Sequence, residues 1–120
     1  MSSTPEGKVK RKISALLKEH GAWYTMPIQR GHNKPGVPDY IGVINGTMFG
    51  IEAKAGSNKP TRAQEGQLKA IRDAGGLGLV INEQTLTVLD YILDALRTAP
   101  AEGTSQLVAT LNNLEVVSDG

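Results

Sequence analysis

An Asn45-Gly46 dipeptide between two β-rich runs, residues 40–44 and 47–53, is the feature that most constrains the fold. A two-residue type I′ turn needs positive φ at both central positions, and Asn-Gly tolerates this better than other pairs. The two runs are therefore predicted to be neighbouring antiparallel strands. Counting outward from the turn places Asp39 six residues before it and Glu52 six residues after it, so the two side chains are expected to lie opposite each other.

Helical patterns flank this hairpin. Thr4-Pro5 predicts the start of a helix that stops before Gly21, and Thr61 with Gln64 fits the capping box of a second helix that ends at Gly75-Gly76. The remaining elements are a strand over 22–26, a loop over 28–38, a buried strand over 77–81 and a helix over about 85–97. This order predicts an α/β fold with one mixed sheet covered by helices.

The chain of 120 residues is long enough for one domain, which we expect over 1–97, followed by a tail over 98–120. Leu107, Leu111 and Leu114 are expected to form a short amphipathic turn in that tail, either packed on the domain or forming an interface. The absence of cysteine excludes disulfides, thiolate zinc sites and cysteine nucleophiles. Because no apolar run approaches the roughly 20 residues of a membrane helix, no membrane partner is expected. Nor does the N-terminus read as a signal peptide, so the cytoplasm is the expected location.

Charge is segregated along the chain. Residues 1–72 carry 12 Lys/Arg and 5 Asp/Glu, whereas residues 73–120 carry 1 Arg and 7 Asp/Glu. A basic N-terminal part favours a polyanionic partner, because Lys and Arg displace counterions from phosphates. The alternative is a solvated surface. The residues expected to contact a DNA backbone are Lys10, Arg11 and Lys12 in the first helix and Arg30, His32 and Lys34 in the loop.

Two carboxylates and a lysine are predicted to converge at the open end of the hairpin. Glu52 and Lys54 share a face because side chains alternate along a strand, and Asp39 lies across from Glu52 on that face, within a patch roughly 5–8 Å across. Carboxylates this close repel unless a cation lies between them or one is protonated. Hard oxygen ligands favour Mg²⁺ or Mn²⁺. Alternatively, Glu52 and Lys54 form a simple ion pair on a charged outer face.

Three segments together resemble a known family. They are Gly36-Val37-Pro38-Asp39, then Ile51-Glu52-Ala53-Lys54, then Thr61 and Gln64 before the helix that ends at Gly75-Gly76. In combination they resemble the PD-(D/E)xK nuclease superfamily and, more narrowly, its VRR-NUC branch, the virus-type replication–repair nucleases. The resemblance covers about residues 5–81. It implies a restriction-endonuclease-like core with the order α-β-β-β-α-β-α.

The resemblance also implies roles for individual residues. Asp39, Glu52 and the backbone carbonyl of Ala53 would hold Mg²⁺, with Mn²⁺ able to substitute. Lys54 would orient the attacking water and offset charge that develops on the phosphate. Gln64 would support the site or position water.

Glu6 matches an acidic residue of the family's first helix, and it shares a face with Val9 and Ile13, so we expect it to face the metal. An acidic residue in the first turn of a helix is also favoured by the helix dipole alone.

The activity implied by the resemblance is metal-dependent DNA cleavage that leaves a 5′-phosphate and a 3′-hydroxyl, in a bacterium or a phage-infected cell. A non-catalytic nucleic-acid-binding module, a Holliday-junction resolvase and a restriction-type enzyme are the alternatives. Short stand-alone members look like dimeric junction-cutting enzymes, so we expect a homodimer that prefers branched DNA. Apolar surface for the dimer is expected on the tail leucines and on Trp23 and Met26.

Overall fold

The computed structural model describes residues 4–28 and 34–118. Its four strands form one mixed sheet in the order β1-β2-β3-β4. β1, β2 and β3 pair antiparallel, whereas β3 and β4 pair parallel. The strands are β1 (Trp23–Thr25), β2 (Tyr40–Ile44), β3 (Thr47–Ala53) and β4 (Leu77–Ile81). The predicted mixed α/β sheet is confirmed.

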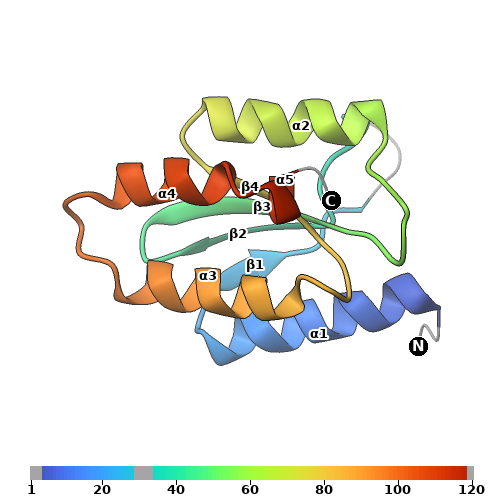
Figure 1. Cartoon of the computed structure of the whole chain (residues 1–120), viewed down its shortest axis with the longest axis horizontal. Helices are drawn as coiled ribbons and strands as arrows, with labels where there is room; N and C mark the ends of the chain where they lie inside the picture. The colour runs from blue at the N-terminus through green and yellow to red at the C-terminus, as the bar shows by residue number, and fades with distance from the viewer. Residues whose placement is uncertain (1–3, 29–33, 119–120) are drawn as a thin grey trace.

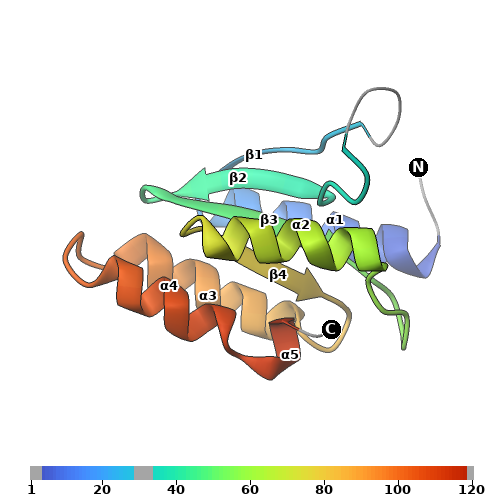
Figure 2. The same ribbon diagram turned by 90° about the horizontal axis from the view of Figure 1, so that it is seen from above.

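Helices lie on both faces of the sheet, as Figures 1 and 2 show. α1 and α3 pack side by side on one face, and α2 lies on the other face against β3 and β4. The helices are α1 (Pro5–Glu19), α2 (Arg62–Asp73), α3 (Leu86–Thr98), α4 (Thr104–Asn112) and α5 (Glu115–Ser118). None of the helices in the described ranges has the length and apolar character needed to cross a membrane.

The β2–β3 hairpin has the predicted turn and register. Asn45 and Gly46 both have positive φ, 47° and 81°. The strand pairs run from Ile44 opposite Thr47 to Tyr40 opposite Ile51. The Asn45 side-chain amide also donates to the carbonyls of Leu96 (3.0 Å) and Ala99 (3.1 Å) at the end of α3. The turn is therefore fastened to the helical layer as well as closed by its own backbone.

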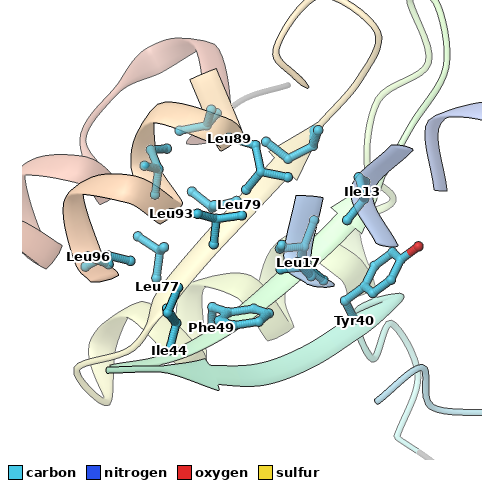
Figure 3. Packing of buried hydrophobic residues seen from close by; sticks show 14 of the residues in the cluster. Ile13, Leu17, Tyr40, Ile44, Phe49, Leu77, Leu79, Leu89, Leu93 and Leu96 are labelled. Atoms are coloured by element: carbon cyan, nitrogen blue, oxygen red, sulfur yellow. The ribbon is translucent and has the colours of Figure 1, made fainter. Parts of the chain in front are cut away.

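The main core fills the space between the sheet and the α1–α3 layer, as Figure 3 shows. Burying each large apolar side chain stabilises the fold by about 1.5–3 kcal/mol, so this layer holds the sheet in place. Its fully buried members include Ile13, Leu17, Tyr40, Phe49, Leu77, Leu79, Leu89 and Leu93.

The segment after residue 98 folds back against β4 as α4 and α5. Leu111 is buried in the core, and Leu107 and Leu114 are half-buried against it. The Asn112 side chain donates to the Gly76 carbonyl (2.9 Å) and accepts from the Gly78 N–H (3.0 Å), which satisfies the outer edge of β4 as another strand would. Of the two alternatives for this segment, the structure therefore has the packed one, and the expectation that these leucines supply a dimer surface is wrong.

Gly36 allows the loop before β2 to approach the first turn of α2. Its φ is +79°, and a Cβ at this position would lie 2.4 Å from the backbone carbonyl of Ala63 and 2.6 Å from the Gln64 nitrogen. Buried Pro38 then packs beside Gly50, where a Cβ would come within 3.2 Å of its ring. The Gly36-Val37-Pro38 segment thus sets the position at which Asp39 enters the sheet.

Gly36→Ala is expected to destabilise the protein more than Gly46→Ala. Both positions have a left-handed backbone, which costs a non-glycine residue roughly 1–2 kcal/mol. The turn glycine has open space around its Cβ position, whereas Gly36 faces backbone. Urea unfolding of the two variants measures the difference, and equal losses would contradict this role of Gly36.

Candidate active site

The hairpin register brings Asp39 and Glu52 together at the open end of β2 and β3. Tyr40 pairs with Ile51, so the next position outward is occupied by these two acidic residues. The Oδ2 atom of Asp39 accepts a hydrogen bond from the Ala53 N–H (2.9 Å), which fixes the carboxylate against β3. The predicted juxtaposition of the two carboxylates is present.

Glu52 is a buried carboxylate with only one of its oxygens bonded. Its side chain is 3% exposed, and Oε2 accepts from the Gln64 amide at 2.8 Å and lies 3.6 Å from the Lys54 Nζ. Within the described residues, Oε1 is buried and has no hydrogen-bond partner. A buried carboxylate oxygen without a donor costs stability, so this atom is a position at which a cation would be favoured.

The pKa of Glu52 is raised from 4.5 to about 7, mainly by burial and to a lesser extent by the negative charge of Asp39. The positive charge of Lys54 opposes both effects. Without a cation, the fold therefore favours the protonated form of Glu52 below about pH 7. A divalent ion beside the two carboxylates would favour the charged form instead.

Lys10 connects α1 to this cluster. Its Nζ lies 3.5 Å from Asp39 Oδ1 and 3.5 Å from Glu6 Oε2, one helical turn away. Burial alone would lower the pKa of Lys10, but the charges of Asp39 and Glu6 outweigh it, and the net shift is upward. The Tyr40 hydroxyl donates to the Lys10 carbonyl (2.7 Å), which holds this part of α1 on β2.

Gln64 connects α2 to the cluster and begins that helix. The predicted capping box is confirmed: the Thr61 hydroxyl accepts from the Gln64 N–H, and Gln64 Oε1 accepts from the Thr61 N–H at 2.8 Å. Since Oε1 is held by the cap, Nε2 is directed to Glu52. The same side chain thus defines the start of the helix and orients the buried carboxylate.

The structure brings together most of the predicted catalytic set. Asp39, Glu52, Lys54 and Gln64 are in contact, and Glu6, 41% exposed, reaches them through Lys10. The role of Lys10 beside Asp39 was missed. The four-residue spacing of Glu6 and Lys10 indicates only the ion pair between these two residues, not the contact of Lys10 with Asp39.

The predicted DNA-contacting residues lie farther apart than the predicted catalytic residues do. Arg11, Lys12 and Lys34 are exposed and lie outside the carboxylate cluster. Arg30 and His32 lie outside the described residues.

The residues present fit a hard divalent cation. Two carboxylates supply oxygen donors, and the buried Glu52 Oε1 has no other partner in the described part of the chain. Lys54, only 14% exposed, keeps a positive charge beside them. This arrangement offers acidic ligands, a fixed cation and an oriented amide at one end of a rigid sheet.

Comparison with known proteins supports the fold. A scan against models of protein families and a search of curated proteins found no match. A search of solved structures found a chain described as "VRR_NUC domain", with a TM-score of 0.62 and 20% sequence identity, over 72% of this chain and 95% of that one. The predicted VRR-NUC fold is therefore confirmed.

Metal-free protein is expected to lose stability as pH rises from about 4.5 to about 7. The folded state binds the Glu52 proton more tightly than the unfolded state, so this contribution is full below the unfolded pKa and lost as pH passes the folded one. A shift of this size corresponds to roughly 3 kcal/mol.

Glu52→Gln lacks this titration and is expected to show a flatter profile. Urea unfolding of both proteins in EDTA between pH 4 and pH 8 measures the difference. Parallel pH profiles would show that Glu52 titrates normally.

Proposed function

We propose that this chain is a metal-dependent DNA endonuclease that hydrolyses phosphodiester bonds. The observation that carries the proposal is the buried Glu52 carboxylate, which faces Asp39 with one oxygen unpartnered in the described chain and has Lys54 3.6 Å from the other. The VRR-NUC fold supports the same conclusion, since the cluster lies on the segments that resemble the nuclease motif.

The ligands of the proposed Mg²⁺ are the carboxylates of Asp39 and Glu52 and the backbone carbonyl of Ala53, and Mn²⁺ is expected to substitute. When bound, such an ion supplies Lewis acidity and lowers the pKa of coordinated water. The surrounding side chains keep the ligands in place: Lys10 and the Ala53 N–H hold Asp39, and the Gln64 amide holds Glu52.

Lys54 is the proposed electrostatic catalyst. The Lys54 side chain is largely buried beside Glu52, where a fixed positive charge acts more strongly than in water. In this position it orients the attacking water and stabilises the negative charge that develops on the phosphate. Glu6 contributes through Lys10, whose contact with Asp39 sets the orientation of that ligand.

A purely structural or binding module is less consistent with these observations. Burying a carboxylate destabilises the fold by several kcal/mol, and by about 3–5 kcal/mol when its ion-pair partner is removed. A surface that only binds nucleic acid does not need a buried carboxylate. Solvent-exposed cations suffice for phosphate contacts. The buried acidic pair therefore favours an enzyme over a non-catalytic module.

The proposed substrate is branched DNA, and the proposed assembly is a homodimer. A four-way junction has symmetry-related strands, and two-fold pairing would present two sites to it. The tail leucines pack inside the chain, so of the side chains expected at the interface Trp23, 64% exposed, and Met26, 46% exposed, remain available.

Purified protein is expected to cleave labelled DNA with Mg²⁺ or Mn²⁺, and Asp39→Asn is expected to abolish the cleavage while leaving the fold intact, since the variant loses a metal ligand. Duplex, flap, single-stranded and four-way-junction substrates are tested side by side. The matched control is Lys69→Ala, which removes an exposed lysine paired with Asp73 on α2. Near wild-type cleavage by Asp39→Asn would show that the proposed site is wrong.

Light scattering at micromolar concentration is expected to give the mass of a dimer, and cleavage is expected to be faster on the four-way junction than on plain duplex. Trp23→Ser should shift the protein toward the monomer and reduce the junction preference. A monomeric wild type that cuts both substrates equally would contradict this assembly.

A further inference from the structure

The first helix separates a basic groove from two smaller hollows of mixed charge. On the side of Met26 and Tyr40, a groove of about 600 Å³ runs along α1. Its polar and charged lining is Lys10, Arg11, Ser14 and Lys18, with no acidic residue among the described lining residues. A concave surface lined by cations of one sign concentrates anions.

The other side of α1 is mixed in charge. Lys12 lines two smaller hollows there, one with Glu19 and Asp90 and the other with Lys8 and Glu83. The pKa of Glu83 is lowered, mainly by a hydrogen bond from the Gly56 N–H and to a lesser extent by the charge of Lys12. Lys12 therefore interacts electrostatically with Glu83 of its own chain, although Lys12 adjoins Arg11 in the sequence.

The basic groove leads to the carboxylate cluster. Lys10 lines the groove, and its Nζ is 3.5 Å from Asp39. Tyr40 lines it too and directly follows Asp39 in the chain. A polyanion in the groove would consequently end beside the proposed ligands, whereas one on the opposite side would meet Glu83 and Asp90.

The spacing of the cations suits a nucleic-acid strand. Arg11 and Lys18 are seven residues apart in the helix, about 10 Å along its axis. Phosphates advance about 3.4 Å per nucleotide along a duplex axis, so these two cations span roughly three nucleotides of one strand.

We propose that one strand of the DNA substrate lies in this groove, with its phosphates on Arg11 and Lys18, and that Lys8 and Lys12 do not contact it. The proposal rests on the proposed function for the direction of the strand toward Asp39. It concerns binding, which is measured without cleavage.

The test compares two charge-matched double variants, Arg11→Ala with Lys18→Ala and Lys8→Ala with Lys12→Ala. All four residues are exposed cations of α1, so each double variant removes the same charge from the same helix. Fluorescence anisotropy with a labelled duplex in EDTA, at a series of salt concentrations, gives the affinity and the salt slope. The groove variant is expected to bind at least tenfold more weakly, with a salt slope lower by about 1.8, and the control variant to keep the wild-type slope.

The single reversals Lys18→Glu and Lys12→Glu repeat the comparison with Arg11 unchanged, and thermal unfolding checks that each variant is folded. Equal losses in the two members of either pair, or a larger loss for the Lys8 and Lys12 variant, would overturn the proposal. A groove effect in a protein that does not cleave would confirm the binding site and refute the nuclease function. A groove variant that cleaves DNA and binds it with wild-type affinity would refute the binding site and support the nuclease function.

Discussion

The buried Glu52 carboxylate is the constraint on which the arrangement at this end of the molecule depends. A charge removed from water is tolerated only when donors or cations surround it. Here Gln64 and Lys54 satisfy one oxygen, and the other has no partner within the described chain. The nearby acidic residue Asp39 makes the charged form less favourable still. A bound cation beside Glu52 and Asp39 would offset this loss of stability.

Three features hold the cluster in register: the hairpin turn, the capping box of α2 and the hydroxyl of Tyr40. The Asn45-Gly46 turn fixes which residues of β2 and β3 are opposite, and a slip by one residue would send Glu52 to the core face, where Phe49 and Ile51 pack. The capping box fixes the Gln64 side chain at the start of α2. The hydroxyl of buried Tyr40 holds α1 on the sheet at Lys10. The turn and the capping box are local in the sequence, whereas Tyr40 and Lys10 are 30 residues apart; together the three bring four elements to one point.

The parts of the structure that could be predicted from the sequence are those that the turn and the capping box determine. Asn45-Gly46 gave the register, and with it the pairing of Asp39 and Glu52; Thr61 and Gln64 gave the helix start. Contacts between distant segments left no comparable signal. Nothing local indicates that Lys10 lies at Asp39, or that the Asn45 amide binds the end of α3.

The tail shows the same limit. Its leucine spacing indicates an apolar face but does not say which surface that face covers, because hydrophobic burial is non-directional. The covering of β4 is specified by Asn112, whose amide hydrogen-bonds to backbone at Gly76 and Gly78. An asparagine in an isolated helix gives no indication of such a role.

Charge segregation along the chain becomes charge segregation in space once the fold is known. The basic N-terminal part includes α1, and the acidic C-terminal part includes α3 and the loop that precedes it, which carry Asp90 and Glu83 beside α1. The net charge of +1 therefore conceals a basic groove on one side of α1 and a side of mixed charge on the other. A polyanion approaching α1 is attracted on the side of Arg11 and Lys18, whereas on the side of α3 the described lining residues offer it acidic groups mixed with cations. Since the attractive side ends at Asp39, the same charge pattern that favours binding also selects the direction of approach to the carboxylates.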